Sequence, residues 1–200
     1  TVRRPVSASK YLQAVKQATA LGFKVVAYQI LGLPGDTLPS MIQTLFFNAK
    51  FPVLLGASPF YLIPHSPIAK QFKGLSEPDA FKARLTAMAI ETRDFRREDL
   101  YTLLVTTRIL NFLKGITFKT ASLSLSKALA IVARKDFRSS LGARILKKLL
   151  KEKVFYAATS RGLEPLPCFK TELFFQLWQK LDRIQTQEGK TIKIRGAKPC

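Results

Sequence analysis

Hydrophobic positions near the start of the chain change from helical to strand spacing. Residues 6–21 carry apolar side chains at helical intervals, which predicts an amphipathic helix. Ser7 or Ser9 can cap this helix, and Gly22 can take the left-handed conformation that ends it. Residues 23–31 then form a nearly continuous apolar run with β-branched and aromatic side chains. Such a run predicts a parallel strand that is buried on both faces.

A turn and a second helix–strand step follow. Residues 32–37, Gly-Leu-Pro-Gly-Asp-Thr, form a turn in which Thr37 can cap the next helix. That helix is expected over residues 38–49, with Pro39 in its first turn, where a missing N–H costs nothing. A second strand is expected over residues 52–63. Strand, helix and strand joined by short loops predict an α/β domain with parallel strands.

The pattern becomes mainly helical beyond this unit. We predict three regions: an α/β core over residues 1–75, a helical segment packed on it over 76–115, and a basic, mainly helical extension over 116–200. In the extension, helices are predicted over residues 122–133, 144–153 and 170–184, and a loose tail over 186–200.

Charge is strongly positive and unevenly distributed. The formal net charge is +20, of which +7 falls on residues 1–113 (14 Lys and Arg against 7 Asp and Glu) and +13 on residues 114–200 (19 against 6). This balance favours nucleic acid, an anionic membrane or an acidic protein as a partner, without choosing among them. The stretch 144–153 is both basic and amphipathic, so it suits a docked surface helix, RNA binding or attachment to anionic lipid.

The cysteines and the hydropathy of the chain indicate which cellular compartment suits it and whether it crosses a membrane. Cys168 and Cys200 match no metal or redox spacing, so we expect free thiols and a reducing cytoplasm. No apolar run reaches the roughly 18 residues that indicate a transmembrane helix, and no signal peptide is recognisable at the start.

Residues 25–37, Val-Val-Ala-Tyr-Gln-Ile-Leu-Gly-Leu-Pro-Gly-Asp-Thr, resemble the fifth-strand motif of radical S-adenosylmethionine (SAM) enzymes. In that family a hydrophobic strand ends in Ile-x-Gly-Leu-Pro-Gly-(Glu/Asp)-Thr. The flanks are similar too: residues 14–23 look like the preceding helix, and residues 58–64 look like the sixth strand. His65-Ser66-Pro67 stands where Gly-Thr-Pro is usual after that strand, so the contact loop departs from the family pattern here. The resemblance covers residues 1–115 and looks most like the iron–sulfur proteins related to cobalamin-dependent radical SAM enzymes.

The resemblance implies a fold and a role. The fold would be the C-terminal part of a partial (β/α) TIM-like barrel, followed by the helical basic region. The role would be the adenine-side wall of the SAM pocket, with a [4Fe–4S] cluster reducing SAM to a 5′-deoxyadenosyl radical and cobalamin as a further cofactor that the subfamily suggests. The implied SAM-contacting residues are Ile30, Leu31, Gly32, Gly35, Asp36, Leu62, Ile63, His65 and Arg4.

Several of these residues also have plainer interpretations. Gly32 and Gly35 would let backbone approach a ligand, but the same turn is also a good strand-to-helix connection. Asp36 could hold that turn instead of touching ligand, and Arg4, with Arg3 beside it, could be a solvated terminal arginine. His65, the single histidine, could be a satisfied polar residue in a proline-bounded loop.

The cluster itself needs cysteines that this sequence lacks. The family holds it on Cys-x-x-x-Cys-x-x-Cys, and neither Cys168 nor Cys200 fits that motif in spacing or position. We therefore expect the cluster ligands upstream of Thr1, no metal site within this chain, and an inactive piece on its own. The sequence assigns neither a catalytic residue nor a substrate. Two alternatives stay open: a radical SAM enzyme that modifies RNA through the basic region, and a non-catalytic basic binding protein on a decayed half-barrel.

Overall fold

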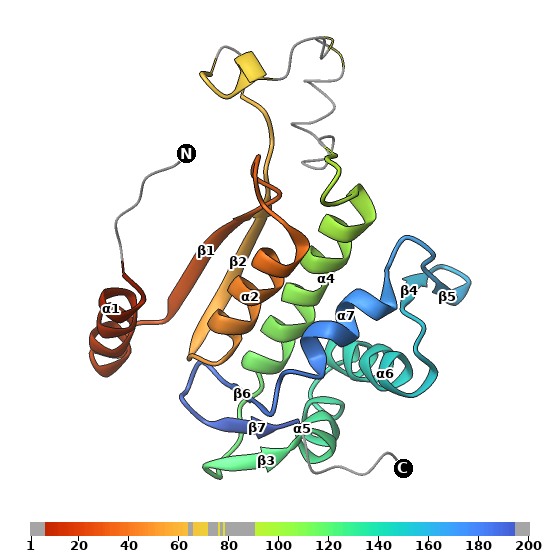
Figure 1. Ribbon diagram of the computed structural model, residues 1–200. Helices are drawn as coiled ribbons and strands as arrows, with labels where there is room; N and C mark the ends of the chain where they lie inside the picture. The colour runs from red at the N-terminus through yellow and green to blue at the C-terminus, as the bar shows by residue number, and fades with distance from the viewer. Residues whose placement is uncertain (1–6, 64–65, 72–75, 77, 79–90, 195–200) are drawn as a thin grey trace.

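The computed structural model describes residues 7–63, 66–71, 76, 78 and 91–194. The described chain folds as a mixed α/β structure with three small sheets, none of them closed (Figure 1). Its elements are α1 (Ala8–Ala20), β1 (Val25–Leu31), α2 (Leu38–Ala49), β2 (Val53–Pro59), η1 (Ala69–Gln71), α4 (Arg97–Lys114), β3 (Ser122–Ser124), α5 (Leu125–Val132), α6 (Phe137–Glu152), β4 (Tyr156–Thr159), β5 (Gly162–Pro165), α7 (Thr171–Trp178), β6 (Arg183–Gln185) and β7 (Thr191–Lys193).

The first helices begin and end where the sequence predicts. The Ser7 side chain accepts from the N–H of Lys10 and caps α1, and Gly22 follows this helix with a φ of 81°. Thr37 caps α2 through a capping box with Ser40. A few neighbouring residues determine where each of these helices begins and ends. The predictions of both helices are confirmed.

Strands β1 and β2 pair in parallel, from Val25 opposite Val53 to Leu31 opposite Pro59. Helices α1, α2 and α4 pack on one face of this pair, the face that carries Ala27 and Leu31. The prediction of a strand buried on both faces is therefore wrong. Along β1 buried and exposed side chains alternate, because no described segment covers the opposite face.

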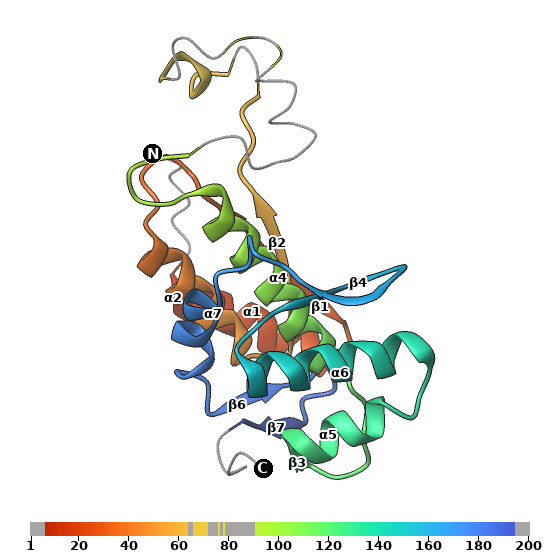
Figure 2. The ribbon, with the colours of Figure 1, turned by 90° about the vertical axis from the view of Figure 1, so that its right-hand side faces the viewer.

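Helix α4 joins the two ends of the chain into one core. It packs against β2 on one side and against α7 on the other, as Figures 1 and 2 both show. A single cluster of buried side chains extends from Leu31 in β1 to Ile192 in β7. The region predicted as an extension over residues 116–200 thus shares its core with the β1–β2 unit.

The C-terminal half contains short strands as well as helices. The hairpin β4–β5 is antiparallel, and a second sheet has the order β3–β7–β6, with β3 parallel and β6 antiparallel to β7. The predicted helix over residues 170–184 is wrong beyond Trp178, because Arg183–Gln185 pairs with β7. The predicted loose tail is also wrong up to residue 194, since Ile192 is fully buried between two strands.

The structure contains only part of the architecture that the resemblance implies. Two parallel strands with a helix between them are present, whereas a barrel needs further parallel strands beside them. The mixed α/β class is confirmed, and the partial barrel stays a prediction. Within the described residues, no helix is both long enough and apolar enough to cross a membrane.

Candidate functional site

The turn between β1 and α2 is held by its own side chains. Asp36 accepts a hydrogen bond from the N–H of Leu33 through Oδ2 at 2.9 Å, which closes the turn across Pro34. Gly32 and Gly35 have φ angles of 79° and 91°, in the left-handed region that favours glycine. Asp36 therefore acts as the residue that shapes this turn, one of the two roles considered for it from the sequence.

Gly32 is required by packing against α4. A Cβ at this position would lie 3.0 Å from both terminal carbons of Leu100 and 3.3 Å from the Phe95 ring. The N–H of Gly32 points into the core and donates to Met41 Sδ at 3.1 Å. Gly35, in contrast, has open space where its Cβ would be. Backbone in this turn is thus accessible from outside at Gly35 and enclosed by the core at Gly32.

The face of the sheet opposite the helices is open and apolar. It carries Val26, Tyr28 and Ile30 of β1, which are 42%, 85% and 53% exposed. Their partners on β2 are Leu54, Gly56 and Ser58. We call these six residues the open sheet face. Its last residue on β1 is Ile30, two positions before Gly32, where the turn begins.

Tyr28 lies across its neighbouring strand. A Cβ at Gly56 would come within 2.8 Å of Tyr28 Cδ1 and 3.1 Å of its Cε1, so the ring occupies the space that a side chain would take. The result is an exposed aromatic ring on the open sheet face. Neither Tyr28 nor Gly56 was predicted from the sequence to be part of a site. The alternation of Val26, Tyr28 and Ile30 with smaller or polar side chains was the signal that could have indicated a one-sided strand.

The predicted wall residues divide between the two faces. Ile30 is on the open sheet face, whereas Leu31 is 1% exposed and packs in the core, because successive strand residues point to opposite faces. After β2 the same division recurs: Leu62 is 3% exposed and Ile63 is 58% exposed. The side chains of Leu31 and Leu62 are therefore buried and those of Ile30 and Ile63 are exposed, and the contact of these residues with SAM stays a prediction.

The remaining predicted residues are not joined to this site by the structure. Arg3, Arg4, His65 and Cys200 lie outside the described residues. Cys168 is a free, exposed thiol in the loop before α7. Across the described ranges, no group of three or more His, Cys, Asp or Glu side chains is arranged to hold a metal ion.

We compared the chain with protein families, curated proteins and solved structures. No family model matches the chain, and no curated protein or solved structure matches it either. The assignment of function therefore depends on the residues and their geometry alone.

Proposed function

We propose that this chain is the C-terminal part of a radical SAM enzyme and forms the adenine-side wall of its SAM pocket. The observation that carries the proposal is the position of the Gly-Leu-Pro-Gly-Asp-Thr turn, at the carboxyl end of a parallel strand and beside the open sheet face. Ligands of α/β folds and barrels bind at this end of the strands. The order of helix, strand, turn, helix and parallel strand supports the resemblance as well.

The wall would be made by a few side chains with distinct roles. Ile30 supplies apolar surface for a flat base, and Tyr28 extends that surface along the sheet. Accessible backbone around Gly35 can pair with polar atoms at the edge of the base, which is how adenine is distinguished from other rings. Asp36 keeps the turn in one conformation, so the ligand does not have to order it on binding.

The cofactors differ in how they fit this chain. SAM bound to a reduced cluster would supply the 5′-deoxyadenosyl radical in the intact enzyme. The cluster needs thiolate ligands, and the described part of the chain offers one isolated cysteine, so the residues present do not fit it. We propose that its ligands precede Thr1, and we assign no residue to cobalamin. The exposed free thiol of Cys168 favours a reducing, cytoplasmic setting.

A titration of the 200-residue chain with SAM tests the wall directly. Methyl and amide NMR signals should shift at Ile30 and Gly35 on addition of SAM or adenosine, and guanosine at equal concentration should shift them less. The variant Ile30→Asp should abolish the shifts, because it places a charge on the apolar surface. Ile131→Asp is the matched control, since Ile131 is a similarly exposed isoleucine on α5, 45% exposed against 53% for Ile30.

Two outcomes would contradict the proposal that the end of β1 forms a wall of the SAM pocket. One is the absence of any response to SAM at the end of β1; the other is an unchanged response in Ile30→Asp. Either result would favour the non-catalytic alternative, in which the glycine turn has a structural role alone.

A second candidate is RNA binding by the basic C-terminal region, alone or as the substrate grip of the enzyme. The observation that favours it is the row of exposed cations Arg144, Lys147 and Lys151 along one face of α6. If this face grips phosphates, affinity for single-stranded RNA should fall steeply with salt, and replacing the three residues by alanine should flatten that dependence. An affinity that does not vary with salt would exclude this candidate.

A further inference from the structure

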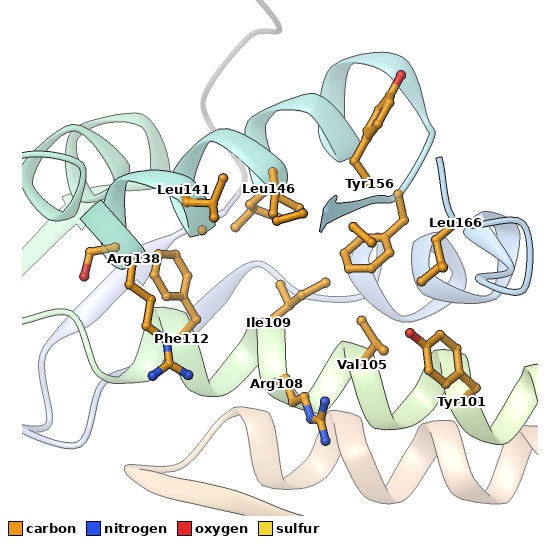
Figure 3. Close-up of a pocket in the computed structure, with 16 residues that line it drawn as sticks. Tyr101, Val105, Arg108, Ile109, Phe112, Arg138, Leu141, Leu146, Tyr156 and Leu166 are labelled. Carbon is orange, nitrogen blue, oxygen red and sulfur yellow. The ribbon is translucent and has the colours of Figure 1, made fainter. Parts of the chain in front are cut away.

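A cavity of about 500 Å³ lies between α4, α6 and the β4–β5 hairpin. Its volume falls within the range of roughly 300 to 1,000 Å³ that is usual for small-molecule sites. Figure 3 shows its lining side chains converging from α4 on one side and α6 on the other. None of these residues belongs to the β1–α2 turn or to the open sheet face, so the cavity is a separate site.

The cavity is lined mostly by aliphatic and aromatic side chains along three turns of α4. Tyr101, Val105, Ile109 and Phe112 of α4 line it at helical spacing, and they span about 16 Å at the usual rise of 1.5 Å per residue. The facing wall is made of branched aliphatic side chains, chiefly from α6: Leu141, Ile145, Leu146 and, from the loop after β5, Leu166. An elongated apolar lining of this kind suits an unbranched chain better than a compact ring system.

Two arginines give the cavity its charge. Arg108 of α4 and Arg138 of α6 both line it, and Figure 3 shows their guanidinium groups on the same side of the cavity. No carboxylate is among the lining residues. Neither guanidinium has a hydrogen-bond or ion-pair partner in the part of the chain that the structure describes. Both cations are therefore free to bind an anion.

The acidic residues at the two ends of α6 are already engaged. Glu152 accepts from the hydroxyl of Tyr156 at 2.7 Å and from Lys148 Nζ at 2.8 Å. Asp136 accepts from the N–H and the hydroxyl of Ser139, each at 2.8 Å. At the cavity wall, burial raises the pKa of Tyr101, which keeps its hydroxyl protonated and able to donate. The polar groups that face the cavity thus supply positive charge and a donor.

We propose that this cavity binds a medium-chain aliphatic carboxylate. The chain would lie along the apolar wall between α4 and α6, and the carboxylate would be held by Arg108 and Arg138, since guanidinium matches a carboxylate in planar geometry. The proposal is independent of SAM binding, because the two sites share no residue.

Calorimetry with decanoate tests it, using the full chain below the micellar concentration of the probe. Decanoate should bind at least about tenfold more tightly than decanol, because only the acid engages the arginines. The double variant Arg108→Ala/Arg138→Ala should lose about tenfold in affinity for decanoate and little for decanol. Ala157→Phe, which adds bulk at a lining position of β4, should weaken both ligands. The matched control is Arg134→Ala/Lys135→Ala, which removes equal charge from exposed positions just before α6 that do not line the cavity, and it should leave binding within about twofold.

Any of three results would overturn the proposal: no binding of decanoate, equal affinity for decanoate and decanol, or the same loss in the control pair as in the arginine pair. The last would assign the binding to general positive charge. Thermal unfolding of each variant confirms that it is folded, and a failure of Ala157→Phe to fold leaves the arginine pair to decide the question.

Discussion

The two glycines of the β1–α2 turn have different reasons to be glycine. Both have positive φ, which a side chain disfavours. Only Gly32 also faces Leu100 and Phe95 at contact distance. A side chain at this position would press against them, so α4 can pack here only because residue 32 is glycine. The motif that resembles a ligand-binding turn is thus partly a packing motif, and ligand access is confined to its outer half.

Replacing each glycine by alanine should separate these effects. Gly35→Ala should lower the free energy of unfolding by about 1 to 2 kcal/mol, the usual cost of left-handed backbone. Gly32→Ala should lower it by roughly 1 to 3 kcal/mol more, because its Cβ overpacks the core beside Leu100. Urea unfolding measures both. Equal effects would mean that Leu100 moves away freely.

Lys114 is a charged residue that the fold has enclosed. It is 1% exposed, and its ammonium donates to the carbonyls of Ala49 at 3.0 Å, Phe51 at 2.6 Å and Gln185 at 3.1 Å. It thereby joins the end of α2, the approach to β2 and strand β6. Burial lowers the pKa of this ammonium from its ordinary 10.5 to about 7.

Stability should therefore depend on pH through Lys114. Between pH 7 and 10.5 the unfolded chain binds the proton that the folded chain releases, so the free energy of unfolding rises with pH in this window. The stabilisation gained when the buried Lys114 loses its proton is complete above pH 10.5, the pKa in the unfolded chain. It is lost as the pH falls towards 7.

Lys114→Met supplies the comparison. It should destabilise the protein by about 2 to 5 kcal/mol, because three buried carbonyls lose their donor. The difference between wild type and variant should widen by up to about 1.4 kcal/mol per pH unit above pH 7. Urea unfolding at several pH values measures it, and a constant difference would show that Lys114 keeps an ordinary pKa.

At the scale of elements, a side chain closes one edge of the β1–β2 sheet. Asn111 of α4 accepts from the N–H of Leu55 at 2.8 Å and donates to its carbonyl at 2.9 Å, as a neighbouring strand would. This edge of β2 is therefore satisfied by a helix at Leu55, which makes β2 an end of the sheet at this point.

Asn111→Ala should lower the free energy of unfolding by about 1 to 3 kcal/mol, because the donor and the acceptor of Leu55 both lose their partner. Asn111→Asp should cost an intermediate amount, since it keeps the acceptor. Gln43→Ala is the control, an exposed amide on α2 whose loss should change stability by less than about 0.5 kcal/mol. Chemical denaturation compares the three, and no cost for Asn111→Ala would mean that water replaces the amide.

Elements fixed by near neighbours could be predicted from the sequence, and those fixed by distant ones could not. The caps at Ser7 and Thr37 depend on residues three positions away. Strand β7 instead depends on Ser122 opposite Thr191 and is three residues long, too short for periodicity to indicate. In the candidate site, the apolar strand and the turn were predicted. The faces of Ile30 and Leu31 were not, because they depend on which side the helices occupy.

Across the whole molecule, one core serves both halves of the chain, and no described segment covers the open sheet face. Exposed Val26, Tyr28 and Ile30 form an apolar patch on the side where a barrel has its interior, which is consistent with the proposed place of this chain in a larger barrel. The cavity between α4 and α6 lies in the other half and has its own chemistry.

A place for this chain in a radical SAM enzyme is best tested by the sequence of the reading frame upstream of the codon for Thr1, translated for about 200 residues, the usual remainder of a barrel. We expect Cys-x-x-x-Cys-x-x-Cys in that stretch, in frame with the chain. An initiator methionine close to Thr1, with no such motif before it, would rule out catalysis by this route and leave a basic α/β binding protein whose glycine turn is structural.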